Sequence, residues 1–254
     1  MHRKTHGFTM IELLVTISLI ALLLVFLLPG LTTGRRNSAF TQCISNMRMF
    51  AIAQQMYAVD HDYNTVHPNW GPATGGWLYD KKRPNGSFYS PSNFSYAERI
   101  DLRETGLLYD YLSADADDLY HCPVDEGPFD DTEIFQETGK RLPVRAMTSY
   151  TFNGAFVGYG SKTGPYNTIG YDRFKDRDIF MWEALATEES SFGFWNDGAN
   201  QPNEGLEERH QDGAPVGRID GSADKLQRSE FLDMAAANVR NDLRCNPDHP
   251  RGYR

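Results

Sequence analysis

The strongest constraint on this chain is an apolar run near its start, GFTMIELLVTISLIALLLVFLLPG from Gly7 to Gly30, in which Glu12 is the only charged residue. At about 1.5 Å per residue, a helix from Met10 to Leu28 is close to the ~30 Å thickness of the hydrocarbon core of a bilayer. A cleavable secretory signal has a shorter apolar stretch, roughly 7–15 residues, followed by a small-residue cleavage site. We therefore predict a membrane-spanning helix rather than a removable secretory signal.

The leader before this run, MHRKTHG, carries Arg3 and Lys4 but no acid. The positive-inside rule therefore favours a cytoplasmic leader and an extracytoplasmic remainder. Arg35 and Arg36 follow the apolar run and weaken this preference, so the orientation depends partly on the shortness of the leader.

The overall charge argues against a nucleic-acid partner. The chain has 25 Lys and Arg against 34 Asp and Glu, a formal net charge of -9, whereas nucleic-acid binding needs a basic footprint. The composition also bears on the fold class. Aromatic residues make up 13% of the chain, and it has 22 Gly and 13 Pro. This composition favours a loop-rich, partly β head over a helical bundle.

Glu12 needs an explanation, because a charge at the centre of a membrane helix costs roughly 2.5–3.5 kcal/mol and is usually partnered. Cleavage after Gly7 would create an α-amine on Phe8, four residues before Glu12 and on the same helical face. This amine could pair with Glu12 of its own chain or of a neighbouring chain.

Past Pro29 and Gly30, where we predict a kink, the apolar residues recur mostly at intervals of three or four. This spacing predicts an amphipathic helix over residues 33–59, half-buried against a head domain. Its apolar face comprises Phe40, Ile44, Met47, Ala51 and Tyr57, with Cys43 and Phe50 beside them. The polar residues Arg35, Arg36, Gln42, Asn46 and Gln55 fall largely off this face.

The rest of the chain alternates long loops with short regular elements. Residues 64–96 are dense in Pro, Gly, Asn, Ser and aromatic residues, which predicts a loop. Aromatic alternation over residues 148–159 around Asn153-Gly154 predicts a hairpin with a type I′ turn. We also predict a helix over 97–112, a strand over 179–184, a hairpin joining 216–219 to 225–226 through Asp220-Gly221, and a helix over 232–243.

The stretch GFTMIELLV, from Gly7 to Val15, resembles the processing and methylation signal of type IV prepilins and type II secretion pseudopilins. The resemblance implies that a prepilin peptidase cuts between Gly7 and Phe8 and methylates the Phe8 amine. It also implies that Glu12 helps to register one subunit against the Phe8 amine of another.

The resemblance implies a pilin-like α+β fold, in which a long bent N-terminal helix packs on a small antiparallel sheet with long loops. We divide the chain into a cytoplasmic leader (1–7), a transmembrane and assembly helix (8–31), an amphipathic stalk (32–60) and an extracytoplasmic head (61–254).

A second motif lies near the C-terminus, where His210 is followed by nine residues and then Asp220-Gly221. Together with blocks elsewhere, this spacing is similar to the processing-associated H-x9-DG group of prepilin-like proteins. The residue directly after Gly221 is Ser222, where this group often has a His. The other blocks are residues 43–47, 57–60, 106–112, 121–125 and 149–154.

Two interpretations of the C-terminal motif stay open. In the first, Asp220-Gly221 forms the hairpin turn and His210 hydrogen-bonds across to pin it. In the second, Asp212 and Asp220 hold calcium, as in the C-terminal loop of some pseudopilins, although calcium needs six to eight oxygens and no EF-hand spacing is present. We expect no other cofactor.

The cysteines are too few for a disulfide scaffold and lack C-x-x-C metal spacing. Outside the cytoplasm Cys43 and Cys122 could form a disulfide, and the alternative is three free or buried thiols, Cys245 included.

These features predict a non-enzymatic subunit, a pseudopilin or minor pilin, of a type IV pilus-like or type II secretion-like filament. Its expected partners are other pilin subunits, the prepilin peptidase and an inner-membrane assembly platform. We expect a single-pass inner-membrane protein that later joins a filament in the periplasm or at the cell surface. The alternative is a membrane-anchored extracytoplasmic protein that binds or degrades polysaccharide, using aromatic residues such as Trp70, Trp77 and Trp195.

Overall fold

The structure is a computed structural model that describes residues 8–71, 74–112, 116–125, 127, 147–162, 167–183, 185, 197–211 and 213–253. Within these ranges, the side chains of residues 27–33, 92 and 96 are outside the description. The chain divides into two compact units, Met1–Ala39 and Phe40–Arg254, which we describe separately.

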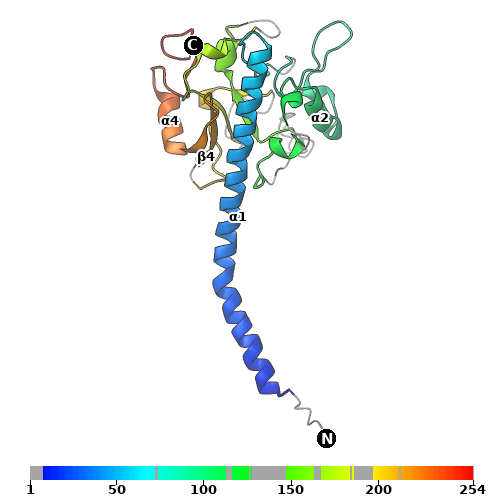
Figure 1. The fold of residues 1–254 in the computed structure, drawn as a ribbon, viewed down its shortest axis with the longest axis vertical. Coiled ribbons are helices and arrows are strands. Elements are labelled where there is room, and N and C mark those ends of the chain that lie inside the picture. Colours follow the sequence, from blue (N-terminus) through cyan, green and yellow to red (C-terminus); the bar gives the residue numbers. More distant parts are fainter. Residues whose placement is uncertain are drawn as a thin grey trace. The chain divides into compact units, whose positions relative to one another are not determined.

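Helix α1 extends from Met10 to Asp60, as the sequence predicts for one long helix (Figure 1). In the first unit its large apolar side chains between Phe8 and Phe26 are exposed. Among the described residues, no helix combines the length and the apolarity needed to cross a membrane. The span over residues 8–31 stays a prediction, as does the kink at Pro29 and Gly30, which falls in the stretch 27–33.

The part of α1 in the second unit is amphipathic, as predicted. Its buried side chains recur at intervals of three and four residues, which is one stripe of a helix. They include Cys43, Met47, Phe50, Gln54 and Tyr57.

The prediction that Asn46 lies on the polar face of this helix is wrong, because its side chain is buried. Its amide Nδ2 donates to the hydroxyl of Tyr150 at 3.3 Å and to the carbonyl of His121 at 3.4 Å. Polarity alone suggested an exposed position, but a buried amide is tolerated where the fold supplies hydrogen-bond partners.

The head contains one sheet with the strand order β3-β1-β2-β4-β5. Strands β1, β2 and β4 are buried along their whole length, whereas the edge strand β5 is partly exposed. The pairing is antiparallel except between β1 and β3, which are parallel, so the prediction of an antiparallel sheet is correct only in part. The strands are Tyr150–Asn153 (β1), Ile179–Glu183 (β2), Ala199–Asn200 (β3), Gly213–Arg218 (β4) and Ala223–Gln227 (β5).

The hairpin predicted through Asp220-Gly221 is confirmed between β4 and β5. Gly221 has φ +88°, which glycine adopts without strain, and the Asp220 carboxylate accepts the Ser222 amide at 2.8 Å. The turn is therefore stabilised by its own residues.

The hairpin predicted at Asn153-Gly154 is wrong. Strand β1 ends at Asn153, a 3₁₀ segment follows over Gly154–Gly160, and β1 pairs with β2 instead. The side-chain Nδ2 of Asn153 donates to the Ile179 carbonyl at 2.8 Å, and its Oδ1 accepts the Ala155 amide at 3.0 Å, which caps the 3₁₀ segment. Gly154 is needed for close packing, because a Cβ there would lie 2.1 Å from the ring of Trp70.

Two predicted helices are shorter in the structure. Helix α2 covers Tyr96–Leu102, and two 3₁₀ turns, Arg103–Thr105 and Tyr109–Tyr111, complete the region predicted as helix over 97–112. Helix α4 covers Arg228–Ala236 and ends well before residue 243. Residues 64–96 are largely loop, as predicted, with a 3₁₀ turn at Pro91–Asn93.

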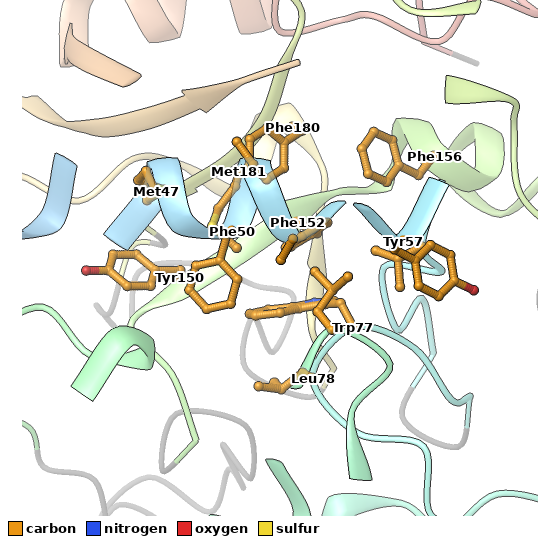
Figure 2. Packing of buried hydrophobic residues seen from close by; sticks show 14 of the residues in the cluster. Met47, Phe50, Tyr57, Trp77, Leu78, Tyr150, Phe152, Phe156, Phe180 and Met181 are labelled. Atoms are coloured by element: carbon orange, nitrogen blue, oxygen red, sulfur yellow. The ribbon is translucent and has the colours of Figure 1, made fainter. Parts of the chain in front are cut away.

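Phe50 of α1 lies at the centre of the aromatic core (Figure 2). Its ring centroid is 5.5 Å from Trp77, 5.2 Å from Tyr120 and 6.4 Å from Tyr150, all in edge-to-face geometry. Trp77 in turn stacks on Phe152 of β1 at 4.6 Å. One helix residue thus packs together three segments that are far apart in the sequence.

Replacing Phe50 with Ala should lower the free energy of unfolding of the head by about 3–5 kcal/mol, because the cavity lies among rings that cannot collapse into it. Ile52→Ala is the matched control, since Ile52 is on the same helix but is 47% exposed and should change stability by no more than about 0.5 kcal/mol. Urea unfolding of the full chain in detergent, followed by tryptophan fluorescence, measures both. Equal effects of the two variants would contradict the packing described.

Candidate functional site

The N-terminal motif forms a capping box at the start of α1. The Thr9 amide and the Thr9 hydroxyl each donate to Oε2 of Glu12 at 2.8 Å, and the Glu12 amide donates to Thr9 Oγ1 at 3.2 Å. Thr9 is the residue before the helix and Glu12 is its third residue, so these bonds satisfy backbone donors that have no partner within the helix. The T-x-x-E signal for this box was present in the sequence but did not enter our prediction.

Gly7, the predicted cleavage position, lies outside the described residues, whereas Phe8 directly precedes the capping box and is 72% exposed. In the intact chain the Glu12 carboxylate accepts hydrogen bonds from Thr9. Its predicted partner, the Phe8 α-amine, would exist only after cleavage, so that pairing stays a prediction.

The two parts of the C-terminal motif lie at opposite ends of β4. His210 precedes this strand and Asp220 follows it. His210 therefore does not pin the turn as predicted, because its Nε2 lies 3.3 Å from Sγ of Cys122 instead. The calcium hypothesis remains untested, since Asp212 lies outside the described residues.

His210 belongs to a buried cluster of four potential metal ligands. Cys43 of α1, Cys122, Glu183 at the end of β2 and His210 each point one ligand atom inward, and these atoms all lie within 4.8 Å of one another. All four residues are buried. Sulfur, imidazole and carboxylate donors are the ligand types of zinc sites.

The two sulfurs of the cluster are the pair for which the sequence suggested a disulfide. Cys43 and Cys122 are side by side but are free thiols in the structure. A hydrogen bond with Cys43, together with burial, raises the pKa of the Cys122 thiol. The third cysteine, Cys245, lies elsewhere, with its sulfur 3.5 Å from the side-chain amide of Asn153.

Glu183 is the functional candidate that the sequence analysis missed. Its side chain is fully buried, and neither carboxylate oxygen has a hydrogen-bond partner among the described residues. Oε1 lies 3.5 Å from Nε2 of His210. An unsatisfied buried polar group costs roughly 1–3 kcal/mol, and more if it is charged. No spacing in the sequence links Glu183 to the cysteines, since the strand register Tyr150↔Glu183 brings it there.

Opposing effects act on the pKa of His210. Burial lowers it, but the contacts with Cys122 and Glu183 outweigh burial and raise the pKa to about 9. The rings of Phe40 and His210 pack in edge-to-face geometry, with centroids 5.3 Å apart. The cluster is thus enclosed by apolar as well as polar groups.

A polar network holds the Cys122 segment in place. The Cys122 amide donates to Ser149 Oγ at 3.0 Å, and the Ser149 hydroxyl donates to Asp125 at 2.7 Å. Arg209, the neighbour of His210, pairs with Asp125 at 3.4 Å and with Glu207 at 3.0 Å. Cys122 and His210 are therefore positioned through a shared acid, Asp125.

The tryptophans suggested as sugar-binding residues do not form a common surface in the described part of the head. Trp77 is fully buried, and its Nε1 donates to the Gly198 carbonyl at 3.0 Å. Trp70 is partly buried, with its ring 6.2 Å from Tyr159. Trp195 lies outside the described residues.

Comparison with known proteins supports a prepilin-like chain. The family described as "Prokaryotic N-terminal methylation motif" matches residues 2–28. The chain is also 35% identical over 63 residues to the "Type IV wide pilus major component PilA4" of Thermus thermophilus, a match that covers 25% of this chain and 48% of that protein. The chain thus spans about half the length of this curated relative. No solved structure matches it.

Thr9→Ala should destabilise the first turn of α1 by about 0.5–2 kcal/mol, because it removes the hydroxyl that caps the Glu12 amide. Thr9→Ser keeps that hydroxyl and is the control. Hydrogen–deuterium exchange of the full chain in detergent should show about 2- to 30-fold faster exchange of the Glu12 amide in Thr9→Ala only, since 1.4 kcal/mol corresponds to tenfold. Unchanged exchange would rule out the capping box.

Proposed function

We propose that this chain is a structural, non-enzymatic subunit of a type IV pilus-like or type II secretion-like filament. The observation that carries the proposal is that the methylation-motif match, residues 2–28, includes the run of large apolar side chains from Phe8 to Phe26, which are exposed. The similarity to a pilus component of Thermus thermophilus supports the same assignment.

The exposed apolar side chains in the first half of α1 must be removed from water to be stable. Its large apolar side chains lie on all sides of the helix, because they occupy nearly consecutive positions rather than one stripe. Burying a side chain of this size contributes about 1.5–3 kcal/mol, so a helix of this kind is stable in lipid or among other apolar helices. These residues are Phe8, Met10, Ile11, Leu13, Leu14, Val15, Ile17, Leu19, Ile20, Leu22, Leu23, Leu24, Val25 and Phe26.

In this proposal the subunit, before assembly, is a single-pass protein of the inner membrane. Its head, residues 61–254, lies outside the cytoplasm. A prepilin peptidase removes residues 1–7 and methylates the Phe8 amine. An assembly platform in the inner membrane then passes the subunit to a filament in which apolar helices cover one another. The large head is exposed on that filament, which fits a pseudopilin or minor pilin.

Glu12 has two roles in this proposal. It caps the start of α1 through Thr9, and after cleavage its charge attracts the Phe8 amine of a neighbouring subunit. The capping bonds need only an acceptor oxygen, which Gln also provides, whereas attraction of the amine needs the negative charge. The two roles can therefore be separated by substitution.

The alternative, a membrane-anchored protein that binds or degrades polysaccharide, depends on exposed aromatic residues in the head. The burial of Trp77 in the core removes one of its three candidate residues. We therefore favour the filament subunit.

Mass spectrometry of the protein from its native host should find a mature chain that begins at Phe8 with a methylated amine. The protein from cells lacking the peptidase should begin at Met1 and is the control. A chain that keeps residues 1–7 in the presence of the peptidase would contradict the proposal.

Glu12→Gln and Glu12→Ala should both abolish incorporation into filaments, because both remove the charge that attracts the neighbouring amine. Thr9→Ala should assemble at a reduced level, since it weakens the cap but keeps the acid. The measurement is the amount of subunit in sheared filaments relative to the amount in membranes. Normal incorporation of Glu12→Gln would show that Glu12 acts only as a cap.

A further inference from the structure

Two distances within the buried cluster fall in the range expected for a tetrahedral metal site. In such a site two ligand atoms are separated by about 1.6 times the metal–ligand bond, so bonds of ~2.0–2.3 Å place ligand atoms about 3.3–3.8 Å apart. Sγ of Cys122 is 3.3 Å from Nε2 of His210, and this nitrogen is 3.5 Å from Oε1 of Glu183. Cys43 Sγ lies in the same group, within 4.8 Å of the other three atoms.

The Glu183 carboxylate faces His210, but the described residues do not satisfy it with hydrogen bonds. Both oxygens of Glu183 are buried and have no hydrogen bond to any described residue. A buried carboxylate is normally paired or coordinates a metal. Oε1 of Glu183 faces the imidazole of His210. This unsatisfied carboxylate is therefore evidence for a metal ion bound between the two side chains.

We propose that Cys43, Cys122, Glu183 and His210 form a structural zinc site. A donor set of two sulfurs, one nitrogen and one oxygen suits zinc, whereas calcium takes six to eight oxygen ligands. Four protein ligands fill the coordination sphere, so no position is left for a water or a substrate, and the site is structural rather than catalytic. When zinc binds, the two thiols ionise and their protons pass to solvent.

This zinc site would join four separate segments of the second unit, Phe40–Arg254. Cys43 lies on α1, Cys122 follows the 3₁₀ turn Ala116–Tyr120, Glu183 ends β2, and His210 precedes β4. The cross-link would fix the stalk helix to the sheet at the side of the core that contains Met47 and Phe50. The histidine of the H-x9-DG spacing would then act as a metal ligand, separate from the Asp220-Gly221 turn.

The competing outcome is a disulfide between Cys43 and Cys122, because the two sulfurs are adjacent and an oxidising compartment favours the bond. A disulfide would consume both sulfur ligands. In the native state the two forms differ by one bound zinc. Once the metal is removed, the reduced chain is two hydrogens heavier than the disulfide form and has two more free thiols, so the forms can be distinguished directly.

The first experiment uses the full chain purified in detergent under reducing conditions and titrated with zinc chloride. Native mass spectrometry should show one zinc per chain, and alkylation should modify Cys43 and Cys122 only after a chelator is added. Cys122→Ser should weaken zinc binding by more than about 100-fold, since even residues that only support ligands contribute about 10- to 100-fold.

Cys245→Ser is the matched control, because Cys245 is also a buried free thiol but lies outside the cluster. It should bind zinc as the unmodified chain does. Glu183→Gln, which keeps an oxygen but loses the charge, should weaken binding by about tenfold or more. Equal loss of zinc in Cys245→Ser and Cys122→Ser would overturn the assignment.

A second experiment does not depend on variants that fold. Cobalt(II) added to the unmodified chain should produce the thiolate-to-cobalt charge-transfer absorption of two cysteine ligands, and zinc should abolish it. The protein isolated from its native host should contain zinc and three reduced cysteines. Absence of the cobalt absorption, a Cys43–Cys122 disulfide in the native protein, or iron or copper in place of zinc would each overturn the proposal.

Discussion

The packing of the second half of helix α1 against the head is the interaction on which the rest of the head depends. The strands are only two to six residues long and are joined by loops and 3₁₀ turns, so they have little stability on their own. Phe50 connects strand β1 to a loop and a 3₁₀ turn, because its ring contacts Tyr150 of β1 as well as Trp77 and Tyr120. A long helix with one continuous buried stripe organises segments that could not form a core by themselves.

Polar residues on the same stripe give this packing its register. Asn46 donates to Tyr150 and to the His121 carbonyl, and Gln54 accepts the Val66 amide at 3.1 Å. Each of these buried groups loses its partners if the helix slides or rotates, and an unsatisfied buried group is costly. Apolar packing holds the helix against the head. The side-chain amides of Asn46 and Gln54 fix the position of the helix along and around its axis. Cys43, one turn before Met47, places a potential metal ligand on the same stripe.

The two halves of α1 serve different purposes. The first half has apolar side chains on all sides and exposes them, which is compatible with lipid or with other helices. The second half concentrates its burial on one face and leaves residues such as Ile52 and Val59 exposed. The similarity to a methylation motif, over residues 2–28, includes part of the first half of α1 and none of the second half.

The sequence by itself determined the long helix, the change from all-round to one-sided apolarity within it, and the Asp220-Gly221 hairpin. These features depend on residues that are neighbours along the chain, whose periodicity and turn chemistry act locally. Only the tertiary structure decided that Asn153-Gly154 does not form a hairpin, that Asn46 is buried, and that His210 faces Cys122 and Glu183. The strand register and the side-chain contacts of the folded chain bring these residues together with partners as many as 104 positions away in the sequence. No local pattern records contacts of that range, because they exist only once the helix and the sheet are packed.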